Sequence, residues 1–286
     1  MSIKVIKLCK EMQAFSEQAR KSGKTIGFVP TMGYLHQGHI SLLKQSTETA
    51  DLSVVSVFVN PTQFAPTEDL TTYPRDFDRD LELLETNGAD VLFFPEPTEI
   101  YPAGFDTFVN TESMAKVIEG VFRPTHFKGV CTVVSILFNI VKPHYSFFGQ
   151  KDAQQAAIIK RMVKDLHFDI EIVVCPIVRE SDGLAMSSRN VYLTDKQHIQ
   201  ANFIFESLEY AETLIRKGER KSKFIVDEIE KIIKKIEEHS IDYIKIVDAE
   251  TFIVSETIME GNEYYILIAC KVGSTRLIDN ILIKVV

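Results

Sequence analysis

The sequence predicts an α/β fold in which a domain built on a parallel sheet is followed by a smaller α+β domain. Two observations carry this prediction. Short apolar runs alternate with segments of helical spacing in the first part of the chain, as in parallel sheets with helical crossovers. The composition then changes: residues 195–240 are rich in Lys and Glu, and the segments after them alternate like antiparallel strands. We therefore predict one domain over residues 1–182 and a second over residues 183–286.

The predicted elements follow one another in the order that such a sheet requires. In the first domain, a buried strand is expected at residues 25–30, and further strands at residues 51–60, 91–94, 145–148 and 170–178. Helices are expected at residues 40–50, 76–86, 130–141 and 152–166, and a loop at residues 123–127. In the second domain, helices within residues 195–240 precede strands at residues 242–247, 264–270 and 276–286. Ligands of open parallel sheets bind beyond the carboxyl ends of the strands, so polar residues that follow strands are the candidates for a site.

Composition and charge exclude several classes of protein. A net charge of −8 argues against general nucleic-acid binding, since phosphate backbones favour basic surfaces. The longest apolar stretch, residues 130–141, is too short to span a bilayer, and the first residues lack the features of a signal peptide. The four cysteines are widely spaced, which argues against a zinc site or a disulfide framework. We therefore expect a cytoplasmic protein with reduced, mostly buried thiols and with no membrane or nucleic-acid partner.

The strongest candidate site is the segment PTMGYLHQGH, residues 30–39, between a predicted strand and a predicted helix. Gly33 and Gly38 allow the backbone to approach a ligand, and the N–H groups that begin a helix attract phosphate. His36 and His39 are three residues apart and so share one face of a helix. Two imidazoles beside a phosphate stabilise the charge that develops when it is attacked. The alternatives are a glycine turn with two surface histidines, or a metal site whose third ligand is not visible nearby.

Two further polar clusters follow predicted strands. In NPTQF, the amides of Asn60 and Gln63 can donate and accept hydrogen bonds, which suits a hydroxy acid. The alternative is a plain turn, because Asn-Pro often begins one. In FGQKDAQQ, Lys151 is a candidate phosphate ligand, and Asp152 either caps the following helix or binds ribose.

Two more features bear on a bound nucleotide. In LAMSSRN, residues 184–190, two hydroxyls next to Arg189 suit the β- and γ-phosphates, and the alternative is a Ser-rich linker. A mobile loop at a domain boundary is also suited to close over ATP and exclude water. Asp80 begins a predicted helix, where acidic residues are favourable, and could reach a Mg²⁺ ion through water.

Together, in this order and at these spacings, the segments resemble the pantothenate synthetase family. The first signature alone, His-x-Gly-His after Thr-x-Gly, is similar to that of the nucleotidylyl-transferase superfamily, whose members attack the α-phosphate of a nucleoside triphosphate. The pieces that match the narrower family lie within residues 30–193: PTMGYLHQGH, VNPTQF, YPR, RPTHFKGV, FGQKDAQQ and VRESDGLAMSSRNVYL. Gln150 stands where relatives often have Glu, and Tyr34 occupies a variable position. The residues after 193 carry no matching motif.

The resemblance implies a Rossmann-like first domain, a C-terminal lid domain and an ATP-dependent ligase. Such an enzyme activates pantoate as a pantoyl-adenylate, releases pyrophosphate, and passes the acyl group to β-alanine to give pantothenate and AMP. The implied catalytic residues are His36, His39, Lys151, Ser187, Ser188 and Arg189. The implied ATP contacts are Pro30, Thr31, Met32, Gly33, Tyr34, Leu35, His36, Gln37, Gly38, His39, Gly149, Gln150, Lys151, Asp152, Val178, Met186, Ser187, Ser188 and Arg189. Pantoate is expected at Asn60, Gln63 and Gln155, and β-alanine at Gln63.

The resemblance also implies Mg²⁺ bound with ATP, without an assigned protein ligand, and a homodimer in the cytoplasm. Three rival hypotheses can be told apart from the ligase. A nucleotidylyl transferase would leave the nucleotide on its product, whereas the ligase releases free AMP. A tRNA-charging synthetase would need a basic surface, which the sequence does not indicate. A regulatory nucleotide-binding module would bind ATP without forming pyrophosphate.

Overall fold

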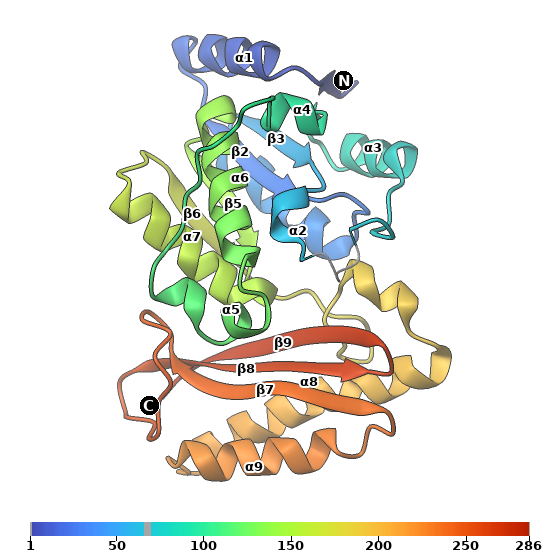
Figure 1. Ribbon diagram of the computed structural model, residues 1–286, viewed down its shortest axis with the longest axis vertical. Coiled ribbons are helices and arrows are strands. Elements are labelled where there is room, and N and C mark those ends of the chain that lie inside the picture. The colour runs from blue at the N-terminus through green and yellow to red at the C-terminus, as the bar shows by residue number, and fades with distance from the viewer. Residues whose placement is uncertain (1, 66–69, 286) are drawn as a thin grey trace. The chain divides into compact units, whose positions relative to one another are not determined.

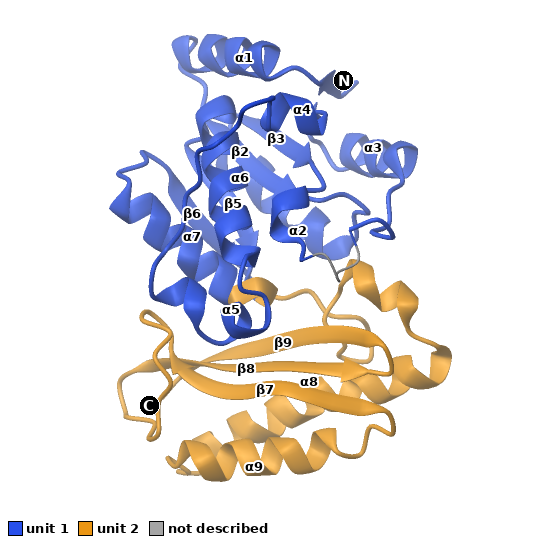
Figure 2. Cartoon of the chain, viewed as in Figure 1, with its two compact units in different colours: residues 1–150, 154–176 blue, residues 151–153, 177–286 orange. Residues whose placement is uncertain are grey.

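The computed structural model describes residues 2–65 and 70–285, which fold into two compact units (Figure 2). Unit 1 consists of residues 1–150 and 154–176, and unit 2 of residues 151–153 and 177–286. Residues 151–153 are thus part of unit 2, although the chain on both sides of them belongs to unit 1. The domain boundary drawn at residues 182 and 183 stays a prediction, and the compact units separate at residues 176 and 177.

Unit 1 is built on a parallel sheet that, among the described residues, has six strands in the order β1-β4-β3-β2-β5-β6. The strands are β1 (Lys4–Ile6), β2 (Ile26–Thr31), β3 (Leu52–Val57), β4 (Val91–Phe93), β5 (Tyr145–Gly149) and β6 (Glu171–Cys175). Every neighbouring pair runs parallel. Successive side chains point to opposite faces, so Phe28 packs in one core and Val29 in another. Because both faces are buried, these strands read as continuous apolar runs.

Helices cover both faces of this sheet (Figure 1). They are α1 (Cys9–Lys21), α2 (Gln37–Thr49), α3 (Phe77–Thr86), α4 (Pro97–Ile100), α5 (Glu119–Phe122), α6 (His126–Val141) and α7 (Ala153–Asp165). On one face, Phe138 of α6 meets Phe28 edge to face at 6.4 Å. On the other face, Leu43 of α2 and Leu84 of α3 pack with Val29. This arrangement confirms the predicted Rossmann-like parallel-sheet domain.

The predicted elements of unit 1 are present, with differences that include two unpredicted short helices, α4 and α5, and a strand β3 that ends at Val57 instead of residue 60. β1 and α1 are not among the predictions, because three residues are too few for a strand pattern and the buried stripe of α1 includes the small residues Ser16 and Ala19. The loop predicted at residues 123–127 is wrong at its end, because α6 begins at His126, whose side chain is buried. The strand predicted over residues 170–178 ends earlier, at Cys175.

Unit 2 combines helices with an antiparallel sheet, as predicted. The elements are α8 (Asp195–Arg216), α9 (Ser222–Ile233), β7 (His239–Asp248), β8 (Glu263–Val272) and β9 (Thr275–Lys284). The strands lie in the order β7-β8-β9, and both pairs are antiparallel. Ile204 of α8, Ile225 of α9 and Ile266 of β8 share one apolar core. The last residue of the strand predicted at 276–286 lies outside the described residues.

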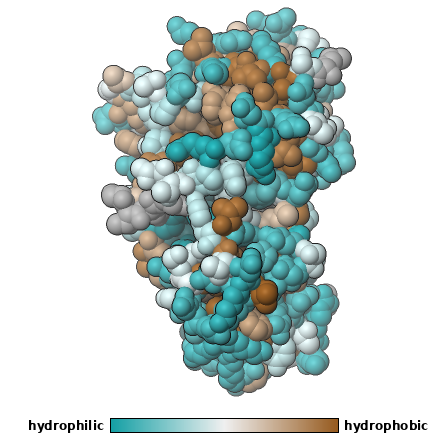
Figure 3. Space-filling model, turned by 90° about the vertical axis from the view of Figure 1, so that its right-hand side faces the viewer, coloured by the Kyte–Doolittle hydropathy of each residue, from teal (hydrophilic) through white to brown (hydrophobic). Residues whose placement is uncertain are grey.

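The face drawn in Figure 3 is mainly hydrophilic, and the cysteines are free and mostly buried, as the composition and the wide cysteine spacing lead us to expect. On this face, hydrophobic side chains gather in a group. Within the described residues, each helix is too short or too polar to cross a bilayer. All four cysteines are free, and Cys131, Cys175 and Cys270 are buried. Burial raises the pKa of Cys131 and of Cys270 to about 12, so both thiols stay protonated and inert at neutral pH.

Candidate active site

The first predicted site segment lies where the order of the sheet reverses. From β2 the chain adds β3 and β4 on one side, and later β5 and β6 on the other. β2 and β5 are parallel neighbours, with Phe28 opposite Ser146, so their carboxyl ends lie at the same edge. Ligands of open α/β sheets bind at such a reversal, between the loops that leave the two strands. Residues 32–36 follow β2 at this edge, and Gln150 follows β5.

Two residues give the loop after β2 its unusual backbone. Gly33 has a φ of 86° and Tyr34 a φ of 50°, both in the left-handed region that disfavours most side chains. A Cβ added to Gly33 would lie 2.9 Å from Val57 Cγ1, so this position requires glycine. The Gly33 N–H donates to Thr31 Oγ1 at 3.2 Å, and that hydroxyl donates to the Ser56 carbonyl at 2.8 Å. The loop is therefore tied to both β2 and β3 where it begins.

The carboxylate of Asp80, on α3, holds the same loop from a second side. Its Oδ2 accepts a hydrogen bond from the Tyr34 N–H, and its Oδ1 accepts one from the Leu35 N–H, both at 2.7 Å. Burial raises the pKa of the Asp80 carboxyl, and the two backbone donors oppose that shift because they favour the charged form. The sequence shows Asp80 only as an acidic residue at a helix start. A hydrogen bond between residues 46 positions apart leaves no local pattern that could reveal it.

His36 and His39 form a reciprocal cap at the start of α2. His36 is the N-cap residue, and its Nδ1 accepts from the Gly38 N–H at 3.1 Å. Nδ1 of His39 accepts from the His36 N–H at 3.2 Å, and the ring centroids are 4.1 Å apart. A ring nitrogen that accepts from an N–H carries no proton, so this hydrogen-bond network assigns the proton of each neutral ring to Nε2. Each imidazole therefore has an N–H donor suited to an anion at the helix start.

The amides of Asn60 and Gln63 form a buried cluster after β3. Asn60 Nδ2 donates to Gln63 Oε1 at 3.0 Å and to the Gly129 carbonyl at 3.1 Å. Asn60 Oδ1 accepts from the Thr62 N–H at 3.3 Å and so caps the short 3₁₀ helix η1 (Pro61–Gln63). Asn60 thus begins a turn, as the alternative hypothesis predicts. The turn places Gln63 Nε2 2.9 Å from the sulfur of Met32 in the first loop.

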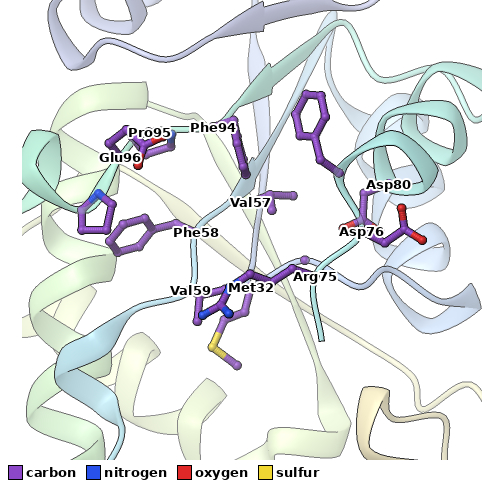
Figure 4. A pocket seen from close by; sticks show the side chains of 13 residues that line it. Met32, Val57, Phe58, Val59, Arg75, Asp76, Asp80, Phe94, Pro95 and Glu96 are labelled. Carbon is purple, nitrogen blue, oxygen red and sulfur yellow. The ribbon is translucent and has the colours of Figure 1, made fainter. Parts of the chain in front are cut away.

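A pocket of about 270 Å³ opens beside the first loop (Figure 4). Its lining comes from the ends of β2, β3 and β4 and from the start of α3. Phe94 forms part of an apolar wall, whereas Arg75 and Glu96 bring opposite charges to the lining. Met32 also lines the pocket, and its sulfur accepts a hydrogen bond from Gln63 Nε2. The Met32 side chain therefore links the pocket to the buried amides after β3.

Near the end of β5, two adjacent glutamines have different surroundings. Gln154 is buried, and its Nε2 donates to the carbonyls of Met114 and Val117 at 2.8 and 2.9 Å. It therefore anchors the segment that leads to α5. Gln155 is half-buried on the first turn of α7, and its predicted contact with pantoate stays a prediction. At Gly149 no atom lies within 4 Å of an added Cβ, which leaves open space beside the backbone.

Unit 2 holds the other predicted nucleotide contacts. The Met186 N–H donates to the Val178 carbonyl at 3.0 Å, which joins two of the predicted residues. The Ser187 hydroxyl accepts from the Arg189 N–H at 3.2 Å and so caps the 3₁₀ helix η4 (Ser188–Tyr192). Lys151 is the middle residue of another 3₁₀ helix, η3 (Gln150–Asp152), immediately before α7. Each unit therefore gathers its own share of the predicted site residues.

The hypothesis that the two histidines belong to a metal site gains no support. Across residues 2–65 and 70–285, no group of three or more His, Cys, Asp or Glu side chains is arranged to hold a metal ion. The capping bonds also occupy Nδ1 of both rings. The geometry instead favours anion binding through N–H donors.

Comparison with known proteins places these features in a family. The family model described as pantoate-beta-alanine ligase matches residues 4–282. A pantothenate synthetase from Thermotoga petrophila is 51% identical over 97% of this chain and 99% of its own length. One from Geobacter sulfurreducens is 51% identical over 97% of this chain and 98% of its own length.

Solved structures show the same similarity. A pantothenate synthetase from Thermus thermophilus has a TM-score of 0.92 at 40% identity, covering 98% of this chain and 99% of that one. A pantoate-beta-alanine ligase from Francisella tularensis, complexed with beta-gamma ATP and beta-alanine, has a TM-score of 0.79 at 34% identity. The match covers 98% of this chain and 97% of that one.

Proposed function

This chain belongs to the pantoate-β-alanine ligase family, and from this premise we propose which of its residues carry each step of the reaction. The enzyme is an ATP-dependent ligase that joins pantoate to β-alanine through a pantoyl-adenylate and releases AMP and pyrophosphate. One observation carries the assignment of residues. It is the imidazole pair at the start of α2, where both rings turn an acceptor nitrogen toward the backbone and keep Nε2 as a donor.

ATP is bound by three segments in this proposal: the loop after β2, the residues after β5, and the stretch from Val178 to Arg189. The phosphates lie at the start of α2, where the helix dipole favours an anion and where Nε2 is the protonated ring nitrogen of His36 and of His39. The glycine-dependent turn at Gly33 supports this placement, because it lets the loop pack closely on Val57 and Asp80 and so fixes the chain that leads to the start of α2. The members of the proposed ATP site are Pro30, Thr31, Met32, Gly33, Tyr34, Leu35, His36, Gln37, Gly38, His39, Gly149, Gln150, Lys151, Asp152, Val178, Met186, Ser187, Ser188 and Arg189.

The chemistry needs charge stabilisation and no covalent nucleophile from the protein. A carboxylate oxygen of pantoate attacks the α-phosphorus, and the bond from that phosphorus to the bridging oxygen breaks, so pyrophosphate leaves. The amine of β-alanine then attacks the acyl carbon, AMP leaves, and the amine loses a proton. Negative charge grows on the phosphate oxygens in the first step, where nearby donors accelerate the reaction most. The proposed donors are His36, His39, Lys151, Ser187, Ser188 and Arg189.

Pantoate is held by the Gln63 and Gln155 amides in this proposal, and β-alanine lies close to Gln63. Asn60 supports this role, because its Nδ2 donates a hydrogen bond to Gln63 Oε1 at 3.0 Å. That bond orients the Gln63 amide so that its N–H₂ group remains the donor end. We therefore propose that Asn60 contributes to pantoate binding chiefly by fixing the direction of this amide.

Mg²⁺ fits the residues present as an ion that arrives with ATP. Mg²⁺ usually keeps several waters and takes its other ligands from phosphates, so it needs no protein cage. Asp80, whose oxygens each accept one backbone bond, is the proposed contact through water. When bound, the ion neutralises charge on the triphosphate.

We also propose a lid, a cellular location and an oligomeric state for this enzyme. Residues 183–286 act as a lid domain, and the loop at residues 184–190 keeps water from the reactive adenylate. The protein works in the cytoplasm, which its free and mostly buried thiols suit. It forms a homodimer, and exposed apolar side chains such as Val121 offer surface for one. Sedimentation equilibrium will show the dimer as twice the chain mass.

ATP–pyrophosphate isotope exchange tests the proposal most directly. With Mg²⁺ and pantoate but no β-alanine, label should pass from pyrophosphate into ATP, because the adenylate forms reversibly. Omitting pantoate should abolish exchange, and adding β-alanine should yield AMP and pantothenate in equal amounts. ATP binding without pantoate-dependent exchange would contradict the proposed first step.

Gln63→Ala should raise the KM for pantoate about 10- to 100-fold and change the KM for ATP much less. The expected loss is the hydrogen bonds of one amide to the substrate, about 1–3 kcal/mol. Steady-state kinetics with each substrate varied in turn measures the split. Gln45→Ala, on the exposed surface of α2, is the matched control and should behave as wild type. An equal rise in both KM values would place Gln63 outside the pantoate site.

A further inference from the structure

The residues after 193 contain no recognised motif, yet two polar side chains of β9 are almost fully buried. Asp279 is 4% exposed and Asn280 is 1% exposed. Burying a carboxylate or an amide is unfavourable unless each is fully hydrogen-bonded, so such residues require partners. Their partners lie in the two segments of unit 2 to which nucleotide contacts are assigned above.

Asn280 reaches the first of these segments. Its Nδ2 donates to the backbone carbonyl of Lys151 at 2.9 Å. Residues 151–153 belong to unit 2, as their orange colour in Figure 2 shows, so this bond lies within one compact unit. The bond fixes the backbone of η3 at the residue whose ammonium is proposed to bind phosphate. Lysine has a long flexible side chain, so the position of its backbone decides which region the charge can reach.

Asp279 reaches the second segment through Arg179. The guanidinium donates to Asp279 Oδ2 at 2.6 Å and Oδ1 at 3.0 Å, a bidentate pair. The same guanidinium donates to the Gly183 carbonyl at 3.1 Å and lies 3.7 Å from the centre of the Phe205 ring. Gly183 has a φ of 101°, and a Cβ there would lie 2.5 Å from the Phe205 ring. The turn that leads into residues 184–190 is thus anchored on β9.

The charges in this network agree with the geometry. Burial raises the pKa of the Asp279 carboxyl, whereas the positive charges of Arg179 and Lys151 act in the opposite direction. Asp279 therefore lies within electrostatic range of both cations. Removing the Asp279 carboxylate would leave the partly buried Arg179 guanidinium without its bidentate partner, which is strongly destabilising for a buried charge.

We propose that Asp279 and Asn280 are positioning residues of the ligase reaction, which hold Lys151 and the segment 177–190 at a fixed separation for the triphosphate. The proposal rests on the function assigned above to Lys151 and to Ser187, Ser188 and Arg189. It gives the C-terminal sheet a part in nucleotide binding without any direct contact to the substrate.

A double-mutant cycle on the full-length enzyme tests this. Asn280→Ala should lower kcat about 10- to 100-fold, because a displacement of about 1 Å in a charge-stabilising group has that effect. The KM for pantoate should stay within about twofold, since the proposal concerns only the phosphates. The matched control Asn262→Ala, at an exposed position before β8, should keep wild-type kcat. Thermal unfolding of every variant shows that the assay temperature lies below its transition.

The cycle with Lys151→Ala separates the possible results. If Asn280 acts through Lys151, adding Asn280→Ala to the Lys151→Ala enzyme should lower kcat by less than about twofold further. Effects that multiply would overturn the proposal, as would a normal kcat in folded Asn280→Ala. A normal kcat in Lys151→Ala would instead remove the assigned function of Lys151 and this proposal with it. Asn280→Ser, a smaller change, replaces Asn280→Ala if that variant does not fold.

Discussion

Replacing His39 by glutamine is expected to lower pantoate-dependent ATP–pyrophosphate exchange about 10²- to 10³-fold while the protein stays folded. Removing one donor that stabilises developing charge usually has an effect of this size. Glutamine is chosen because the third position of a helix favours a side chain that accepts from the N-cap N–H, as His39 does at 3.2 Å. The cap survives in this variant, so the imidazole alone is tested.

His39→Ala and His167→Asn complete the experiment. His39→Ala removes the cap and the ring together, so it should show the same loss of exchange and also unfold at a lower temperature. His167 is exposed and has a φ of 53°, which asparagine tolerates, so His167→Asn should keep full exchange. Exchange near the wild-type rate in folded His39→Gln would exclude His39 from the chemical step.

Gly129→Ala is expected to destabilise the protein by about 1–3 kcal/mol and to raise the KM for pantoate. The first turn of α6 lies against η1, and a Cβ at Gly129 would lie 2.5 Å from the Thr62 carbonyl oxygen and 2.6 Å from the Gln63 nitrogen. Alanine favours a helix over glycine by about 1 kcal/mol, but here the methyl meets backbone that cannot rotate away. The turn that carries Gln63 must therefore move.

Differential scanning calorimetry and pantoate kinetics measure the two effects together. Asn139→Ala, at an exposed position on the same helix, is the control and should leave both quantities close to wild type. Transition temperatures are compared only between variants, because a chain with two compact units need not unfold in one step. A stable Gly129→Ala enzyme with an unchanged KM for pantoate would show that η1 and α6 are not tightly coupled.

Much of the fold could be predicted because its pattern is local. The valine-rich run that becomes β3 and the apolar run of α6 are both buried on several sides, and each shows this in consecutive residues. β1 escapes prediction because its three residues gain their strand character only by pairing with β4, far along the chain. The start of α6 escapes because His126 is polar and yet buried, with Nδ1 3.1 Å from the Gln63 carbonyl.

The candidate site, too, could be predicted only where its pattern is local. The loop after β2 could be recognised, since two glycines and two histidines fall within seven residues after a strand. The reciprocal histidine cap is not among the predictions, because the spacing of His36 and His39 indicates only that they lie one helical turn apart. The supports of the site could not be predicted. Asp80 and Asn280 lie 45 and 129 positions from the residues they hold, and single sequences do not record such pairings.

The division of the chain bears on how this enzyme can be recombined. The polypeptide enters unit 2 at residue 151, leaves it after residue 153, and returns at residue 177. A single crossover at residue 176 would therefore join a β9 from one parent to a residue 151 from the other. Chimeras between family members should instead exchange residues 151–153 together with 177–286, so that Asn280 and Lys151 are inherited as one module.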